Sequence, residues 1–192
     1  MFFYFPSCSF VVKALTQMNK LHRLLRYDLP LHLVLFLTNF LPDNTPFLAL
    51  RGRLAGLFLG SCGVHFELGR NVNFYNPSRI HLGNNVYIAY GCVLLAIGDI
   101  TLGDEVMLAP YVVISAANHT RRAGSYRFGD SEILPIEIGA GSWVGAHVTI
   151  LPGASIGRGS LVASNAAVLR GVYPPDALLA GVPAQVKKTL SG

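Results

Sequence analysis

The stretch that decides the fold is residues 136–157, which read IEIGAGSWVGAHVTILPGASIG. An aliphatic residue recurs in it at every sixth position, at Ile138, Val144, Ile150 and Ile156. A fixed internal period is the sequence signature of a chain built by stacking one short structural unit. We therefore expect a repeat architecture in which each unit needs its neighbours to bury its apolar side chains.

The six-residue spacing continues on both sides of this stretch, in groups of three. We call its aliphatic positions the inward positions: Leu82, Ile88, Leu94, Leu102, Leu108, Ile114, Ile138, Val144, Ile150, Ile156, Val162 and Val168. An earlier group at Cys62, Leu68 and Phe74 fits the same spacing. The residue two before each inward position is mostly apolar or small, so alternate side chains of each short strand would face one core.

The residue that follows each inward position shows a second, longer period. Over a group of three it is small, small and then variable, as in Gly139, Gly145 and Leu151. Because a small residue is favoured where the chain turns sharply, three short strands are expected to form one triangular coil. Such coils would stack at the normal strand spacing of about 4.8 Å.

Extra residues are inserted into the repeat always at the same place in a group of three. Two intervals of eight residues, 74–82 and 94–102, and one of 24, 114–138, follow the third inward position of a group. Loops that leave a triangular prism from one corner explain this, whereas a β-sandwich or a βαβ fold with chance spacing does not. The sequence predicts a mainly β chain: a parallel β-helix of about five coils over 62–192, after an apolar, partly helical segment over 1–61.

The composition excludes several classes of protein. The chain has 192 residues, of which 52% are hydrophobic and 13% charged, with a net charge of +5. This length suits one domain with a small appendage, and so apolar a chain is not disordered. Its most apolar stretch, 29–41, is 13 residues long and contains Pro30, His32 and Asn39. A membrane span needs about 20 residues, so we expect no transmembrane helix.

Other absences narrow the class further. Residues 1–12, MFFYFPSCSFVV, lack the basic start and the small-residue cleavage site of a signal peptide, so a cytoplasmic chain is expected. Cys8, Cys62 and Cys92 are odd in number and lack CxxC spacing, which disfavours disulfides and a zinc site. Basic residues are not clustered with aromatic ones along a strand face, so no nucleic-acid partner is expected.

The segment 1–61 has six basic and two acidic residues, and so carries +4 of the net charge of +5. Helices are expected over 13–27 and 48–59, with breaks at Pro6, Pro30, Pro42 and Pro46. In the first helix, one face would carry Leu15, Met18, Leu21, Leu24 and Leu25, and the other Lys20, Arg23 and Arg26. Two interpretations stay open: the segment caps the first coil, or it makes peripheral contact with an anionic membrane.

Three motifs resemble the sugar O-acetyltransferase branch of the hexapeptide-repeat acyltransferases. They are IEIGAGSWVG at 136–145, ILPGASIG at 150–157 and AGVPA at 180–184. The resemblance covers residues 62–188 and implies a left-handed β-helix, acetyl-CoA as acyl donor, and a homotrimer with sites between subunits. The implied acceptor is a hydroxyl of a sugar or of a cell-surface polysaccharide precursor.

The long interval contains a loop at 115–135, SAANHTRRAGSYRFGDSEILP. Transfer of an acetyl group to a hydroxyl requires removal of the hydroxyl proton, and histidine suits that role near neutral pH. The resemblance implies a catalytic histidine at the start of such a loop, and His119 matches that position. Asn118 beside it and Asn85 are polar candidates for contact with the acceptor. His147 is a second candidate for the catalytic group.

The resemblance also implies where the donor binds. Ala146 and Ser164 match positions whose backbone contacts acetyl-CoA, while Arg170 and Lys188 match basic positions near its phosphates. Trp143 matches a tryptophan at the junction of acceptor and donor, although packing in a subunit interface is an alternative. The histidines lack the close pair of the β-helical zinc enzymes, so no metal is expected.

The sequence departs from the maltose and galactoside enzymes at two positions. Ala89 and Ala96 stand where those enzymes have an asparagine and an aspartate that help to hold the sugar, so a different acceptor is expected. N-acetylation of an amino sugar is a related alternative function. A non-catalytic β-helix that serves as an assembly scaffold is an alternative from another class.

Overall fold

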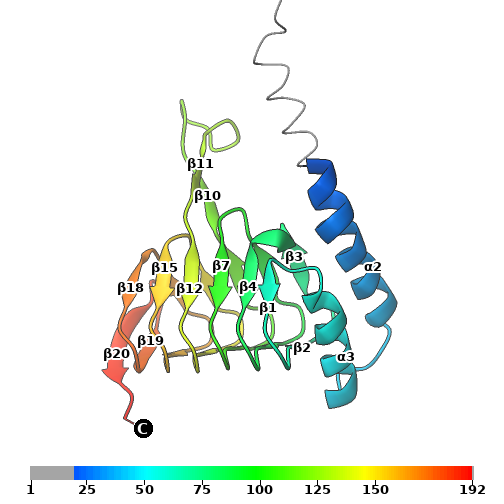
Figure 1. Ribbon diagram of the computed structural model, residues 1–192. Coiled ribbons are helices and arrows are strands. Elements are labelled where there is room, and N and C mark those ends of the chain that lie inside the picture. Colours follow the sequence, from blue (N-terminus) through cyan, green and yellow to red (C-terminus); the bar gives the residue numbers. More distant parts are fainter. Residues whose placement is uncertain (1–19, 192) are drawn as a thin grey trace, which may run out of the picture.

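The computed structural model describes residues 20–191, and it consists of a triangular β-prism with helices at its N-terminal end (Figure 1). The helical elements are η1 (Leu24–Asp28), α2 (Leu29–Thr38), α3 (Thr45–Gly56) and the short η2 (Pro77–Arg79). The other elements are strands, most of them two or three residues long. Such short strands gain little from their own length, so the prism depends on contacts between coils.

The strands form three parallel sheets, one on each face of the prism. Face A contains β1 (Ser61–Cys62), β4 (Ile80–Leu82), β7 (Ile100–Leu102), β12 (Ile136–Ile138), β15 (Ala154–Ile156) and β18 (Gly171–Tyr173). Face B contains β2 (Glu67–Leu68), β5 (Tyr87–Ile88), β8 (Met107–Leu108), β13 (Trp143–Val144), β16 (Leu161–Val162), β19 (Ala177–Ala180) and β20 (Gln185–Thr189). Face C contains β3 (Asn73–Tyr75), β6 (Val93–Leu95), β9 (Val113–Ser115), β14 (Thr149–Ile150) and β17 (Ala167–Val168).

The predicted repeat is confirmed in register and in burial. On face B, for example, Ile88 lies opposite Leu108, which lies opposite Val144 of the next coil. All twelve inward positions from Leu82 to Val168 are at most 5% exposed, and the residues two before them are equally buried. Five complete coils are followed by a partial sixth, made of β18 and β19. The chain is therefore a parallel β-helix.

The small residue after an inward position is needed for a reason other than the sharp turn that we expected there. A Cβ on Gly103 would lie 2.7 Å from the backbone nitrogen of Ala140, and one on Gly145 would lie 2.7 Å from that of Ser164. These glycines are therefore required by the close approach of the next coil. The sharp turn lies two residues after the small residue. After Ala163, for example, Asn165 takes a φ of 63°.

The first and last coils are covered in different ways. At the C-terminal end, β20 pairs antiparallel with β19. At the N-terminal end, α3 lies against the first coil, and a Cβ on Gly52 would collide with the carbonyl oxygen of Phe66. Each end of the stack is thereby partly covered, on face B by β20 at the C-terminal end and by α3 against β2 at the N-terminal end.

The predicted break at Pro30 is wrong, because the chain stays helical through η1 and α2. Proline lacks the N–H for the usual helical bond and its ring crowds the carbonyl four residues earlier. In η1 the Leu29 N–H bonds to the Leu24 carbonyl, five residues back, and this wider turn accommodates the ring. The predicted second helix over 48–59 begins earlier, at Thr45, because the Asn44 side chain accepts a bond from the Phe47 N–H. Predicted features at 1–19, including Pro6, Leu15 and Met18, lie outside the described residues.

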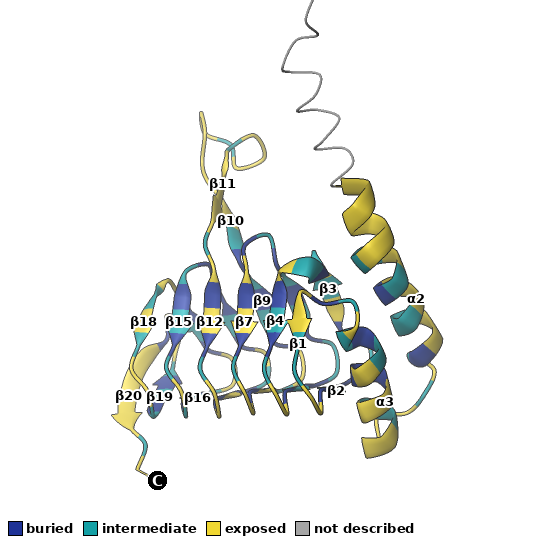
Figure 2. Cartoon of the chain, in the orientation of Figure 1, coloured by how far each residue is buried: buried dark blue, intermediate teal, exposed yellow. Residues whose placement is uncertain are grey.

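The burial pattern of the N-terminal helices also differs from the expectation. Leu21, Leu24 and Leu25 are 41–57% exposed rather than packed on the prism (Figure 2). Leu31 supplies the buried contact of α2, with Val34 and Leu35 half-buried against the core. The capping interpretation therefore holds for α3, while much of the preceding helix remains apolar and exposed.

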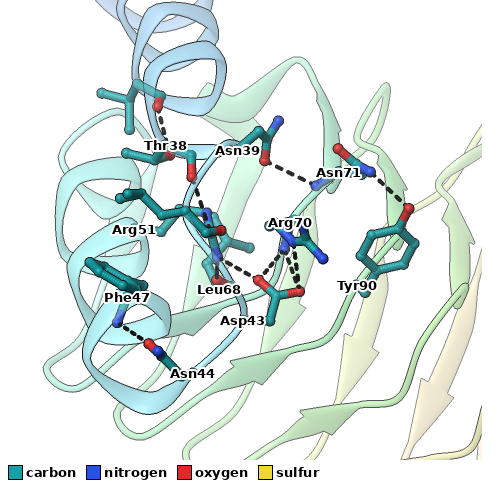
Figure 3. Close-up of polar contacts among 12 residues, drawn as sticks. Thr38, Asn39, Asp43, Asn44, Phe47, Arg51, Leu68, Arg70, Asn71 and Tyr90 are labelled. Atoms are coloured by element: carbon teal, nitrogen blue, oxygen red, sulfur yellow. Dashed lines mark hydrogen bonds and ion pairs between the residues drawn. The ribbon is translucent and has the colours of Figure 1, made fainter.

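Arg51 is one of the residues that join the helical segment to the prism, beside Asp43 and Asn39, which accept bonds from the Arg70 and Asn71 N–H groups (Figure 3). The Arg51 side chain is fully buried. Its guanidinium pairs with the Asp43 carboxylate at 3.0 Å and donates to the carbonyl oxygen of Leu68 on β2 at 2.6 Å. It also donates to the carbonyls of Thr38 and Leu41 at the end of α2. Burial lowers the pKa of Arg51, and the Asp43 charge opposes that shift. Arg51 is thus not part of a basic surface.

Replacing Arg51 by alanine is expected to destabilise the protein by about 3 kcal/mol, because Asp43 and three carbonyls would lose their shared partner. Thermal unfolding at fixed protein concentration measures this loss. Arg53→Ala is the control, since Arg53 lies on the same helix and is exposed. Equal melting temperatures for the two variants would contradict the role of Arg51.

Candidate active site

The loop predicted at 115–135 is a hairpin arm that rises from the corner between face C and face A (Figure 1). Its strands are β10 (Ala117–His119) and β11 (Ser131–Ile133), which pair antiparallel. His119 lies opposite Ser131, and Asn118 lies opposite Glu132. Beyond the strands, the Thr120 N–H and hydroxyl both donate to the Asp130 carbonyl, at 2.8 and 2.9 Å. The arm therefore presents His119 at a defined position.

A groove of about 420 Å³ runs along the base of this arm. It is lined by Tyr75, Leu95, Ile97, Ser115, Ala117, Asn118, His119 and Ser131. The His119 side chain is exposed, so it is open to a ligand in the groove. The groove thus brings together two of the predicted site residues, Asn118 and His119.

The floor of the groove was not predicted from the sequence. Tyr75, Leu95 and Ser115 lie side by side there, because they pair in register across β3, β6 and β9. All three occupy the variable slot after the third inward position of their coils, where the rhythm of small residues is interrupted. This variable slot was the signal in the sequence that could have located the groove floor. A side chain larger than alanine at this corner can line a surface, because it does not have to fit beneath the next coil.

The positions predicted to contact the donor lie at another corner. Ala146 and Ser164 follow β13 and β16 and stack on consecutive coils at the corner between faces B and C. The Asn165 N–H donates to the Ala146 carbonyl at 2.9 Å, which fixes this stack. Ser164 is exposed and Ala146 is half-buried, so a ligand can reach the row they form.

The remaining predicted residues are spread over the prism. Trp143 lies on the outer side of face B and is 50% exposed, and Lys188 lies on β20 at the end of the same face. Arg170 lies near the arm, 3.4 Å from Glu132 of β11. Asn85 lies at the corner between faces A and B with a φ of 57°, where its backbone turns the chain. One protomer therefore does not bring the predicted donor and acceptor residues together.

Neither Cys92 nor His147 is placed for catalysis in the groove. Cys92 is fully buried, its thiol donates to the Ala109 carbonyl, and burial raises its pKa to about 11. Such a thiol stays protonated near neutral pH and is a poor nucleophile. The His147 ring stacks on Tyr111 with 5.1 Å between the centroids, at the corner of Ala146. Within residues 20–191, no three His, Cys, Asp or Glu side chains are grouped to hold a metal ion.

Ala89 and Ala96, at which the sequence was expected to differ from the maltose and galactoside enzymes, are 2% and 0% exposed. Neither residue lines the groove at the base of the arm, and Ala89 lies at the corner between faces B and C. On face C the groove is lined by Tyr75, Leu95 and Ser115, and the arm adds the polar side chains of Asn118, His119 and Ser131.

The fold, the repeat and the groove together define a protein of the hexapeptide-repeat β-helix class. Residues 135–170 match the model of the bacterial transferase hexapeptide family (six repeats). The chain is 33% identical to galactoside O-acetyltransferase of Escherichia coli K12, over 62% of this chain and 59% of that protein. It is 31% identical to an E. coli K12 protein named for O-acetyl transfer in lipopolysaccharide biosynthesis, over 68% of each chain.

The structure is similar to that of galactoside acetyltransferase in complex with coenzyme A. The TM-score is 0.74 at 27% identity, with coverage of 85% of this chain and 80% of the other. The chain belongs to the hexapeptide-repeat acetyltransferase family. It spans between half and three-fifths of the length of the first two curated relatives that it matches. None of the helices within residues 20–191 is long and apolar enough to cross a membrane.

Proposed function

We propose that the protein transfers an acetyl group from acetyl-CoA to a hydroxyl of a sugar or a polysaccharide precursor, with His119 as general base. The observation that carries this proposal is the position of His119, which is exposed in a groove whose floor is mainly apolar. Such a floor suits one face of a sugar ring, and the polar side chains of the arm suit its hydroxyls. Relatives named as O-acetyltransferases support the reaction class.

The reaction is a direct transfer between donor and acceptor. The His119 imidazole takes the hydroxyl proton as the acceptor oxygen forms its bond to the thioester carbon. The carbon–sulfur bond then breaks, and the imidazolium returns the proton to the leaving thiolate. Backbone N–H groups would stabilise the oxyanion between these steps. The buried, protonated Cys92 takes no part as a covalent relay.

Replacing His119 by glutamine is expected to lower kcat by a factor on the order of 10²–10⁴, because the proton acceptor is lost. Thiol release from acetyl-CoA, measured with a panel of sugars, gives the rate. His65→Asn is the matched control, since His65 occupies a turn with a φ of 58° that asparagine tolerates. If no sugar supports turnover that depends on His119, the proposal fails and a scaffold role is favoured. A loss confined to His147→Asn would move the base to the other corner.

The site lies between subunits of a homotrimer in this proposal. His119 rises from the corner between faces C and A, whereas Ala146 and Ser164 lie at the corner between faces B and C. A stacked prism is too rigid to bring two of its own corners together. A second copy can place its row of Ala146 and Ser164, here called the donor row, opposite the arm. In a closed threefold ring, each of the three arms meets the donor row of a neighbouring copy.

Mixing two inactive variants tests this arrangement. His119→Gln removes the base, and Ala146→Trp blocks the donor row, so each is expected to be inactive alone. Co-expressed, the two are expected to regain a clear fraction of activity, because some sites receive one intact contribution from each chain. Sedimentation of the wild type is expected to give the mass of a trimer. A fully active monomer, or no recovery on co-expression, would overturn the shared site.

The proposal includes peripheral contact of the N-terminal segment with an anionic membrane. The helix through η1 and α2, with the residues after it, exposes seven large apolar side chains at 49–77%: Leu21, Leu25, Leu29, Leu33, Phe36, Leu37 and Phe40. Their spacing of mainly three or four residues places most of them along one side of the helix. Lys20 and Arg23 lie at its start, where they suit lipid phosphates.

Flotation with vesicles tests this contact. The protein is expected to float with phosphatidylcholine vesicles that contain phosphatidylglycerol, and Leu33→Glu with Phe36→Glu is expected to abolish flotation. Val172→Glu is the control, because Val172 is 88% exposed on β18, at the opposite end of the prism. Equal recovery of the helix variant and the wild type would refute membrane contact.

A further inference from the structure

The tip of the arm, residues 120–130, concentrates positive charge and aromatic rings. It carries Arg121, Arg122 and Arg127 against one acidic residue, Asp130, and so has a net charge of +2. All three arginines are exposed. Tyr126 and Phe128 beside them are 60% and 76% exposed. The tip therefore offers cations next to an apolar surface.

These arginines differ from most others in the described part of the chain. Arg23, Arg51, Arg70, Arg79 and Arg170 each lie within 4.0 Å of a carboxylate. Between residues 20 and 191, no carboxylate lies within that distance of the three arginines of the tip. Like charges gathered on a short hairpin repel one another, and a bound anion would relieve that repulsion.

The tip is an ordered turn rather than a free strand end. Arg122 and Ser125 exchange two backbone hydrogen bonds of 2.9 Å. The Arg127 guanidinium lies 5.9 Å from the centre of the Phe128 ring. Arg121 follows His119 by two residues, a distance of at most about 7 Å along the chain. A ligand whose hydroxyl lies at His119 can thus reach Arg121, the first arginine of the tip.

We infer that the tip binds a phosphate group carried by the acceptor, so that the substrate class is a phosphorylated sugar. This inference rests on the proposed transfer at His119. Guanidinium groups present paired N–H donors that match phosphate oxygens, and three of them suit a dianion better than a neutral sugar. A sugar phosphate, a nucleotide sugar and a lipid-linked sugar share this chemistry. The phosphate would fix the sugar so that one hydroxyl faces His119.

The test uses the whole protein without lipid and compares glucose 1-phosphate with glucose, and galactose 1-phosphate with galactose. The triple variant Arg121→Gln, Arg122→Gln, Arg127→Gln removes the charge of the tip. We expect its dissociation constants for the phosphorylated sugars to rise at least tenfold by calorimetry, with binding of the neutral sugars unchanged. The corresponding triple lysine variant is expected to recover part of the affinity. Arg158→Gln, at the exposed corner between faces A and B, is the control.

Four results would overturn the inference. The wild type could bind phosphorylated and neutral sugars equally, or the triple variant could bind glucose 1-phosphate as the wild type does. In a separate thiol-release assay, the triple variant could raise the KM for acetyl-CoA alone, which would assign the tip to the donor. In a separate flotation assay, it could lose vesicle binding alone, which would assign the tip to lipid headgroups. Binding is measured without turnover, so absence of His119-dependent turnover refutes the transfer and leaves the phosphate test readable.

Discussion

The close stacking of successive coils is the constraint on which the rest of the structure depends. Each short strand obtains its backbone hydrogen bonds from the coils above and below, and its inward side chains complete one aliphatic column. Gly103 and Gly145 show how little room the stack leaves, since a Cβ on either would meet the next backbone. Chemistry is thereby confined to the corners and to the outer sides of the faces, because the interior has no space for it.

The ends of the stack impose a second requirement. An uncovered first coil would expose both its aliphatic column and its unpaired strand edges. The chain covers it with α3 and joins α3 to β2 through the buried Arg51, whose bonds to Asp43 and to the Leu68 carbonyl link helix and strand. The cap adds some apolar surface of its own to that of the column, with Ala55 and Leu59 buried in the core cluster. The cap does not account for the outer side of the preceding helix, where Leu33 and Phe36 are exposed.

The six-residue period made the fold predictable, because it states directly which side chains face inward. It also located the arm, since only an insertion at one corner leaves the stack intact. The groove floor was harder, because Tyr75 and Leu95 become neighbours through pairing between coils 20 residues apart. Arg51 was not recognisable as buried, since a basic residue in a short helix usually faces solvent and its partners come from three other segments.

The division of the site between corners also bears on how the acceptor is recognised. The floor of the groove is built from the prism, by Tyr75, Leu95 and Ser115. Changing the floor therefore means changing residues that the stack holds in register. The arm is less restricted, because its two strands pair with each other and its backbone hydrogen bond to the prism lies at its base, between Leu134 and Ala116. Under the proposed function, changes in the residues of the arm can thus alter which acceptor is bound, while the prism keeps the fold and the row of Ala146 and Ser164 unchanged.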